Sequence, residues 1–486
     1  MVVRIGRRRQ RQPGDSLSTT RNRPMTAGDG GTADSSGPSD SAGSGDSVGL
    51  LQAVAIEVGL IVGAGLFSLT GVATTLAGTA VPLSYVFTFT VVAMSLVPTA
   101  ALAAARPVTG GNYWYPSRLW SPRIAFLTAW GLSISMFGGG LPVYALSFGR
   151  YVDSLVPVDP VFVGVVVLTA FYLVNLAGID VAASVQLLLF VTLVVSLVVF
   201  VVVGAPAVDT ANFQPFLSNG VTGLLTGAGV LYFVCLGANF IVDLGEDVQA
   251  ATVTIPKSLA VSIPLVFVLY VGTALVAVGS VGATGPSSMA GATLSVPAEA
   301  ALPPALATFF VVGGALFAIA TSINAVFIIA PKYMVVLADD GFFPAALAET
   351  NDRFGTPHWG LTLVFALSLA SLLSPLPVAD LGSLLGFGGI VLIVPMMVAA
   401  VRFVRRSPER YAATPIPVPA TLTVGLAVTA VCANAVLLVL LASQSPLLFA
   451  AWAGLTVGGG GVYYLARRQY LDSRGIALLD GFDEEF

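Results

Sequence analysis

Charged residues are scarce in this chain. Asp, Glu, Lys and Arg make up only 9% of its 486 residues, and 56% of the residues are hydrophobic. A soluble domain carries roughly 25% charged residues. The formal net charge of −4 is small for this length, so no nucleic-acid partner is expected. The composition predicts a multi-pass membrane protein rather than a soluble enzyme with one membrane anchor.

Cysteine and histidine are nearly absent as well. The two cysteines, Cys235 and Cys432, both lie in apolar segments, so neither a disulfide framework nor a metal site is expected. We interpret the single histidine, His358, as a surface residue where a loop meets a helix. The apolar segments hold no histidine and no paired carboxylates, so the sequence does not predict an enzyme.

Residues 1–48 differ from the rest of the chain. Seven arginines crowd the first half of this segment, and Gly, Ser and Asp dominate the second half. Such a composition cannot bury a core, and we expect a disordered cytoplasmic tail. No short apolar region follows the arginines, which argues against an export signal. Met25 is an alternative translation start that would remove all seven arginines.

Long apolar runs fill the remainder. Residues 58–105 contain no Asp, Glu, Lys, Arg or His. A spanning helix needs about 20 apolar residues, and runs bounded by polar residues, proline or glycine predict twelve spans. They are residues 50–77, 81–105, 123–152, 160–177, 181–205, 220–243, 257–283, 302–337, 358–376, 380–404, 418–441 and 446–466.

Basic residues predict the orientation of these spans. If the amino terminus is cytoplasmic, 20 of the 21 lysines and arginines fall inside and only Arg150 falls outside. An excess of Lys and Arg marks cytoplasmic loops. We therefore expect a plasma-membrane protein with both termini in the cytoplasm, which agrees with an even number of spans.

Glycines interrupt two of the spans at corresponding places. Gly63 and Gly65 lie inside the first span, while Gly237 and the polar residue Asn239 lie inside the sixth. Within a bilayer, non-helical backbone is tolerated only where it is packed in protein or lines a cavity. Paired interruptions in two halves point to a transporter binding site. The alternative is that the glycines only allow close helix packing.

A broken helix offers charged ends without charged side chains. The end of one half exposes carbonyl groups with partial negative charge, and the start of the next exposes N–H groups with partial positive charge. An amino acid, which carries both an ammonium group and a carboxylate, fits such a pair.

Several motifs occur in an order that resembles the amino acid–polyamine–organocation (APC) transporter superfamily. Each motif alone is loose, but together they are specific at the level of the superfamily and cover residues 50–360. They are Gly63-Ala64-Gly65-Leu66-Phe67; Pro107 with Gly110, Gly111, Tyr113 and Arg118; Tyr232-Phe233 with Gly237, Glu246-Asp247 and Ile255-Pro256-Lys257; and Ser322, Asn324, Asp340-Gly341, Pro344 and Thr356-Pro357.

The resemblance implies an all-α membrane protein with 12 transmembrane helices. These would form a 5+5 inverted repeat, with helices 1 and 6 broken, plus two C-terminal helices, and the protein would work by alternating access. The corresponding parts are residues 49–205 for the first repeat, 206–404 for the second, 405–466 for the last two helices and 467–486 for a cytoplasmic tail.

The resemblance also implies a substrate site. The substrate carboxylate would meet the N–H groups of Ala64 and Gly65, and the ammonium group would meet the carbonyls of Ile61, Phe233 and Leu236. Phe233 would also stand as an aromatic gate. With the glycines and polar residue of the two breaks, the expected site comprises Ile61, Gly63, Ala64, Gly65, Phe233, Leu236, Gly237 and Asn239.

Two departures from the family pattern favour a neutral amino acid. Ala64 stands where many relatives have Ser, and Asn239 stands where many have Glu or Asp. A buried acid would suit a cationic substrate or a proton, whereas Asn does not titrate. The alternative is a polyamine or other organic amine carried by the same fold, as a transporter or exchanger. A sensor or channel is a remote alternative, because no continuous polar stripe is visible.

The coupling ion is the only cofactor expected, and the sequence leaves it open. The carbonyls of Gly59 and Val62, with the hydroxyls of Thr321 and Ser322, could form an all-oxygen sodium site. Alternatively, these hydroxyls bond carbonyls of their own helix.

Acidic residues near the spans give further candidates. Glu57 is the only charged residue in the first span. An acid within a span is a functional candidate, so Glu57 is expected either to titrate during transport or to pair with a basic loop residue. Asp243 and Lys332 lie nearer the cytoplasmic ends of their spans, and we interpret them as gate or loop anchors.

Overall fold

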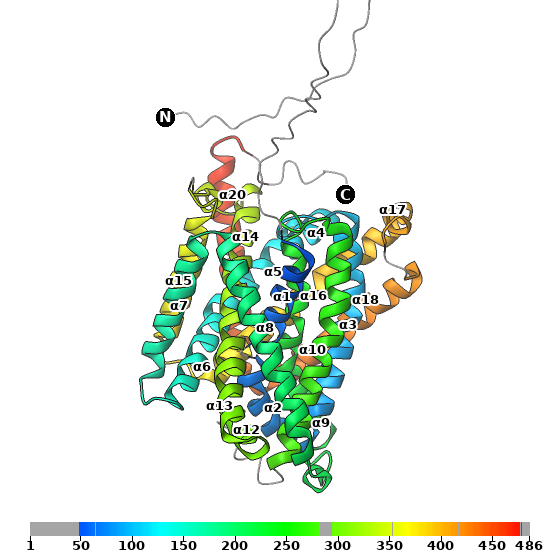
Figure 1. Ribbon diagram of the computed structural model, residues 1–486. Helices are drawn as coiled ribbons and strands as arrows, with labels where there is room; N and C mark the ends of the chain where they lie inside the picture. The colour runs from blue at the N-terminus through cyan, green and yellow to red at the C-terminus, as the bar shows by residue number, and fades with distance from the viewer. Residues whose placement is uncertain are drawn as a thin grey trace, which may run out of the picture. The chain divides into compact units, whose positions relative to one another are not determined.

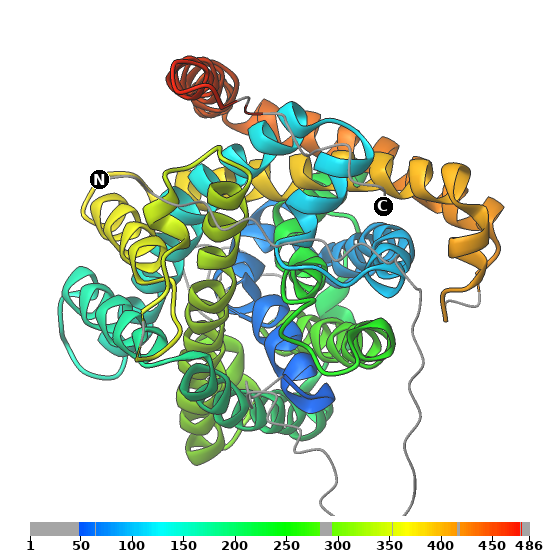
Figure 2. The ribbon, with the colours of Figure 1, turned by 90° about the horizontal axis from the view of Figure 1, so that it is seen from above.

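Helix α1 (Leu50–Ile61) lies in the middle of the computed structural model, with the other helices packed around it (Figures 1 and 2). The structure describes residues 48–63, 65–281, 294–351, 353–415, 418–476 and 478, without the side chains of residues 68, 179, 180, 233, 234, 378 and 379. No β-strand occurs in this part of the chain; two isolated bridges join Val48 to Val248 and Thr109 to Leu244. The expected tail over residues 1–48 lies, except for Val48, outside the described residues.

The helices before the second break follow one another with short connections. After α1 come η1 (Gly65–Leu69, a π-helix), α2 (Thr70–Ala77), η2 (Gly78–Ala80), α3 (Val81–Ala105), α4 (Gly111–Leu119), α5 (Pro122–Ser135), η3 (Met136–Gly140, a π-helix), α6 (Leu141–Asp153), α7 (Pro160–Leu176), α8 (Ile179–Gly204), η4 (Ala205–Ala207) and η5 (Thr210–Phe213).

The remaining helices run from the second break to the end of the described chain. They are α9 (Gly220–Leu236), η6 (Gly237–Asp243, a 3-10 helix), α10 (Ala251–Val281), α12 (Ser295–Ala301), α13 (Pro304–Phe309), η7 (Phe310–Leu316), α14 (Phe317–Asp339), η8 (Ala345–Ala348), α15 (His358–Leu372), α16 (Val378–Arg406), α17 (Pro408–Ala412), α18 (Ala420–Gln444), α19 (Pro446–Ala453), η9 (Gly454–Gly459) and α20 (Gly460–Asp472).

Ten helical segments of the described chain are long and apolar enough to cross a membrane. They are Leu50–Phe67, Thr70–Ala105, Pro122–Asp153, Val181–Ala207, Gly220–Asp243, Ala251–Val281, Pro304–Asp339, Asp380–Arg406, Ala420–Gln444 and Pro446–Asp472. The spans expected at residues 160–177 and 358–376 are instead the shorter helices α7 and α15. The first ends before Gly178, whose φ is 118°, and the second ends before Pro375 and Pro377. A multi-pass helical membrane protein is therefore confirmed, and the number twelve stays a prediction.

Hydroxyl groups and glycines bring the helices close together. Ser84 and Thr88 of α3 donate hydrogen bonds to backbone carbonyls of α9, at 2.9 Å to Leu224 and 3.1 Å to Ala228. Small and hydroxyl-bearing residues are typical of helix contacts inside membranes. Other apolar side chains stay exposed; Val439 of α18, for example, is 68% exposed. Such residues suit a surface that contacts lipid.

One close approach between neighbouring helices gives a test of this packing. A Cβ on Gly149 of α6 would lie 2.0 Å from the Pro160 carbonyl oxygen, at the start of α7. We expect Gly149→Ala to destabilise the protein by about 1–3 kcal/mol, because the clash is with main chain that cannot rotate away. Its thermal unfolding midpoint in detergent should fall. The control is Gly425→Ala in α18, where nothing lies within 4 Å of the added Cβ; an equal fall in both variants would contradict the packing described.

Candidate transport site

The first break separates α1 from the π-helix that follows. Helix α1 ends at Ile61, Val62 is its cap residue with φ −85° and ψ 62°, and the helical path resumes at Gly65. The helix therefore opens at the predicted glycines. Ala64, the expected partner of a substrate carboxylate, lies outside the described residues.

Side chains from distant helices satisfy the carbonyls freed at this break. The hydroxyl of Tyr270 in α10 donates to the Ile61 carbonyl. The hydroxyl of Ser322 in α14 donates to the Gly59 carbonyl at 2.8 Å. Tyr270 thus bonds a carbonyl that the family resemblance assigns to the substrate ammonium group. Sequence reasoning missed Tyr270, although a tyrosine in the middle of an apolar span is a signal that could have found it.

Gly63 is required at the break because Ser322 fills the space beside it. A Cβ on Gly63 would lie 1.4 Å from Ser322 Oγ. Ser322 therefore contacts the break both through its bond to the Gly59 carbonyl and through packing against Gly63. This contact joins α1 to α14.

The second break is a change of helix type rather than an opening. Helix α9 ends at Leu236 and continues directly as the 3-10 helix η6, which begins at Gly237. A 3-10 helix keeps backbone hydrogen bonds but winds more tightly. The structure thus differs from the predicted open break here. The backbone stays helical, and Nδ2 of Asn239 also donates to the Leu236 carbonyl at 3.4 Å.

Gly237 brings the two breaks into contact. A Cβ on Gly237 would lie 2.6 Å from the carbonyl carbon and oxygen of Leu60 and 2.7 Å from the Ile61 nitrogen. No side chain other than hydrogen allows this approach. The structure therefore places two predicted site residues, Ile61 and Gly237, side by side. The side chain of Phe233, expected as a gate, lies outside the described residues.

Asn239 is fully buried and bonded to two other elements. Its Oδ1 accepts a hydrogen bond from Thr99 of α3 at 3.1 Å, and its carbonyl accepts one from Asn112 Nδ2 of α4 at 2.9 Å. Asn239 therefore fixes η6 to α3 and α4 in this structure. Thr99 and Asn112 are partners that sequence reasoning did not identify.

An apolar cavity adjoins both breaks. Leu60 of α1 and Phe240 of η6 line one side of it. Ser133 and Tyr333 are the polar residues of its wall. The other lining residues are Leu132, Met136, Phe137, Val326, Ile329 and Ala330, from α5, η3 and α14. This wall suits an apolar group and offers no carboxylate.

Of the oxygens expected to hold sodium, the Gly59 carbonyl and the Ser322 hydroxyl are in contact, but both hydroxyls of the expected site already have acceptors. Ser322 bonds the Gly59 carbonyl, as described above, and Thr321 Oγ1 donates to the Ala318 carbonyl of its own helix at 2.6 Å. The bond made by Thr321 matches the alternative left open by the sequence.

An amide side chain occupies the space next to this group. Nε2 of Gln186 in α8 would lie 1.9 Å from a Cβ on Gly59 and donates to the Ala55 carbonyl at 3.3 Å. Its Oε1 accepts from Asn324 Nδ2 at 3.0 Å, and that same nitrogen donates to the Ala182 carbonyl at 2.9 Å. Because a carbonyl only accepts, these bonds fix the orientation of both amides. The N–H groups of Gln186 therefore face α1, where a sodium ion would require oxygen ligands.

Glu57 contacts hydroxyl groups rather than a basic residue. It is fully buried, and Ser258 and Ser262 of α10 are hydrogen-bonded to its carboxyl oxygens. The sequence left open a pairing of Glu57 with a basic loop residue. That pairing is not among the contacts of Glu57 with the described residues.

Asp243 and Lys332 act as loop anchors, as predicted. The carboxyl of Asp243 accepts hydrogen bonds from the backbone and side-chain nitrogens of Asn112, at 2.8 and 2.9 Å. Lys332 forms an ion pair with Asp247 at 2.9 Å. These contacts hold η6 and the following loop against α4 and α14, at the end of the bundle predicted to face the cytoplasm.

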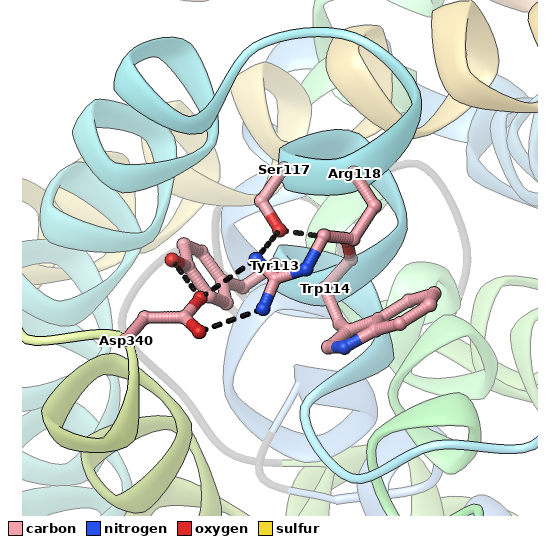
Figure 3. A network of polar contacts seen from close by, with 5 residues as sticks. All are labelled: Tyr113, Trp114, Ser117, Arg118 and Asp340. Atoms are coloured by element: carbon pink, nitrogen blue, oxygen red, sulfur yellow. Dashed lines mark hydrogen bonds and ion pairs between the residues drawn. The ribbon is translucent and has the colours of Figure 1, made fainter. Parts of the chain in front are cut away.

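A bidentate ion pair joins α4 to the end of α14 at this same end of the bundle. Nη1 and Nη2 of Arg118 in α4 bond the two carboxylate oxygens of Asp340 at 2.9 and 2.7 Å (Figure 3). The two side chains are only 9% and 12% exposed. Tyr113 donates to Asp340 at 2.6 Å, and burial together with the Asp340 charge raises the pKa of that phenol, so it stays a donor. We define Tyr113, Arg118 and Asp340 as the inner closure.

Helix α20 holds the turn that carries Asp340. Nε and Nη2 of Arg467 donate to the carbonyls of Gly341 and Phe343, at 2.8 and 2.9 Å. The hydroxyl of Tyr463 donates to the Phe342 carbonyl at 3.0 Å. The inner closure therefore depends on α4, on the end of α14 and on α20.

The contact between the breaks gives a matched pair of variants in one region. We expect Gly237→Ala to abolish or strongly reduce amino acid uptake, because the added methyl group meets the α1 backbone at 2.6 Å. The control is Gly229→Ala in α9, where the nearest atoms lie at 3.8 Å. Uptake into vesicles, normalised to folded protein, checks this; equal rates for the two variants would show that the close approach is not required.

The inner closure gives a test on stability. Removing one partner of a buried ion pair costs about 3–5 kcal/mol, so we expect Arg118→Ala to lower the thermal unfolding midpoint clearly. The matched control is Arg468→Ala, which removes the pair to Asp472, whose side chains are 52% and 51% exposed; surface pairs contribute about 0–1 kcal/mol. A midpoint for Arg118→Ala no lower than that of the control would contradict the burial assigned to the pair.

The chain is similar in sequence to several known transporters. A transporter of Mycobacterium tuberculosis (strain ATCC 25618 / H37Rv) of uncharacterised function is 29% identical over 348 residues, which cover 70% of this chain and 76% of the relative. The branched-chain amino acid permease of Bacillus subtilis (strain 168) is 24% identical, covering 72% of this chain and 79% of the relative. The vacuolar cationic amino acid transporter 8 of Arabidopsis thaliana is 28% identical, covering 72% of this chain and 61% of the relative.

A family profile covers most of the chain. The profile described as amino acid permease matches residues 48–458, a stretch that includes both breaks, the cavity and the inner closure. The protein belongs to the amino acid permease family.

Proposed function

We propose that this protein is a secondary active transporter that moves neutral amino acids with apolar side chains by alternating access. The observation that carries the proposal is the contact of the two breaks, where Gly237 lies against the backbone of Leu60 and Ile61. Helix ends at such a site can bind a carboxylate and an ammonium group without charged side chains.

The backbone groups have different roles in this proposal. The Ile61 carbonyl, which accepts from Tyr270 in this structure, would accept from the substrate ammonium group instead. The carbonyls of Phe233 and Leu236 would complete that half, and the N–H groups of Ala64 and Gly65 would bind the carboxylate. Tyr270 would then keep the empty break satisfied, since an unpaired carbonyl in apolar surroundings is costly.

The cavity supports the choice of an apolar side chain. Its wall consists of leucine, methionine, phenylalanine, valine, isoleucine and alanine residues, with one serine and one tyrosine. Burial of apolar surface is favourable by about 25 cal/mol per Å². The space in this structure is only about 30 Å³, so a branched aliphatic side chain would gain this term once the wall moves apart, and the relative named as a branched-chain amino acid permease agrees with that class.

A cationic amino acid or other organic amine, carried or exchanged by the same fold, is the second candidate. The plant relative named as a cationic amino acid transporter favours it. An ammonium or guanidinium group buried in the cavity would need an acidic partner, and none of the lining residues is acidic. Asn239, where an acid would suit a cation, is neutral and already bonded to Thr99.

The repeat arrangement and the location are further parts of the proposal. Segments from α1 to α8 would form the first repeat and segments from α9 to α16 the second, with the breaks opening each. The protein would lie in the plasma membrane. The inner closure would face the cytoplasm, because basic residues concentrate at that end of the bundle.

The proton receives more support than sodium as the coupling ion. A sodium ion at Gly59, Val62, Thr321 and Ser322 would have to displace the hydroxyl bonds made there, and a Gln186 N–H donates to the Ala55 carbonyl one turn before Gly59. We therefore expect leucine uptake to be unchanged when sodium is replaced by choline at fixed pH. A large loss of uptake would instead assign sodium to this group of oxygens.

Ligand-dependent stability of the purified protein tests the substrate class. We expect leucine, isoleucine and valine to raise its thermal unfolding midpoint, because a ligand at 100 times its Kd stabilises by about 2.7 kcal/mol. Arginine and putrescine should leave the midpoint unchanged, because each would bring a charge into a cavity that offers it no acidic partner. Saturable leucine uptake in liposomes would confirm transport; stabilisation by arginine or putrescine alone would assign the protein to the cationic class.

A further inference from the structure

The carboxyl group of Glu57 lies between the cytoplasmic halves of α1 and α10, as the predicted orientation assigns them. Ser258 Oγ lies 2.7 Å from Glu57 Oε1, and Ser262 Oγ lies within hydrogen-bond distance of Oε2. The two serines are four residues apart, one helical turn, and are fully buried together with Glu57. No role in holding the amino acid is assigned to this group.

The hydrogen bonds around Ser258 have two solutions, one for each protonation state of Glu57. Ser258 Oγ also lies 2.9 Å from the Ile255 carbonyl oxygen, which only accepts. If Ser258 donates its single proton to Ile255, its contact with Glu57 requires a proton from the carboxyl. If Glu57 is ionised, Ser258 turns its proton to Glu57 and leaves that carbonyl. The neutral carboxyl is the state that uses all three contacts.

No cation neutralises Glu57 among the described residues. The titratable groups on the elements packed against α1 have other surroundings: Lys257 of α10 is exposed, Asp243 of η6 is bonded to Asn112, Lys332 of α14 pairs with Asp247, and Asp339 is exposed. Tyr270 bonds Ile61, and Tyr232, Cys235 and Tyr333 are buried and carry no positive charge; the side chain of Asp180 in α8 is not described. A carboxylate buried without a cation is costly inside a membrane protein.

The carboxyl also sits on the helix that carries the break. Glu57 precedes Gly63 by six residues, less than two turns. Helix α10 holds α1 at two levels, through Ser258 and Ser262 at Glu57 and through Tyr270 at Ile61. A change in the contact at Glu57 therefore acts on the same helix end that is proposed to bind the substrate.

We propose that Glu57 binds the coupling proton, carrying it while α1 is packed against α10 and releasing it to water when the two helices separate. The inference rests on the proposed transport function and assigns its driving ion. The O–H bond of the carboxyl breaks, the proton passes to water on the side that opens, and water replaces the two serine hydroxyls as the hydrogen-bond donors to the ionised carboxylate. Reprotonation restores the packed pair, so each cycle moves one proton.

The test uses the full chain in liposomes with radiolabelled leucine and an imposed pH gradient. We expect the gradient to stimulate uptake by the wild-type protein several-fold and to leave uptake by Glu57→Gln unstimulated, since glutamine preserves size and hydrogen bonding but does not titrate. An entrapped pH-sensitive dye should report proton movement with leucine in the wild type and none in the variant. Glu349→Gln, an exposed acid, is the matched control and should keep the full response.

Two outcomes would overturn the inference, and a third would overturn the function beneath it. Gradient-driven uptake or a dye signal retained by Glu57→Gln would remove Glu57 as the proton site, as would wild-type uptake that ignores the gradient. Absence of leucine uptake under every condition would instead reject the proposed substrate class.

A second variant keeps the inference testable if Glu57→Gln does not fold. Removing both partners in Ser258→Ala/Ser262→Ala should shift the midpoint of the uptake–pH profile, because the packed acid then loses both of its hydrogen-bond partners on α10. An unmoved midpoint would overturn the inference.

Discussion

The arrangement of this protein depends on how the backbone groups freed at the end of α1 are satisfied. A carbonyl left unpaired in apolar surroundings costs a few kcal/mol, and the chain cannot use water freely at that depth. Tyr270 from α10 and Ser322 from α14 supply hydroxyl donors, and Gly237 lets η6 approach the same stretch. Three helices distant in sequence are therefore drawn to one point. A substrate with an ammonium group offers the same kind of bond as Tyr270 and can compete for it.

The contacts of α1 fall into two groups of different chemistry. Neutral amides and hydroxyls, from Gln186 and Ser322, connect it to α8 and α14. On the α10 side, besides the Tyr270 hydroxyl, the contact is an acid hydrogen-bonded to two serines. The amide network has one hydrogen-bond arrangement fixed by backbone carbonyls, whereas the acid has two. The hydrogen bonds from α1 to α8 and α14 therefore stay the same, whereas the contact between α1 and α10 changes when Glu57 gains or loses a proton.

Sequence reasoning found what depends on local chemistry. Glycines in an apolar run predicted the opening at Gly63, and the positions of Asp243 and Lys332 near span ends predicted their role as anchors. The contact of Arg118 with Asp340 joins residues 222 positions apart, so no spacing rule could reveal it. Tyr270 is also a tertiary partner: its hydroxyl in an apolar span signals that it needs a bond, but the sequence does not reveal that the Ile61 carbonyl accepts it. At Gly237 the backbone remained helical, since glycine permits an open conformation without requiring one.

The bonds from α20 to the turn after α14 have a consequence for the last helices of the chain. Those helices lie outside the predicted repeats and carry none of the expected site residues. Arg467 nevertheless caps the carbonyls of Gly341 and Phe343, which flank the turn after Asp340. The position of Asp340 relative to Arg118 is thus set partly by α20, which carries none of the expected site residues. The carboxyl-terminal helices therefore help to position the inner closure.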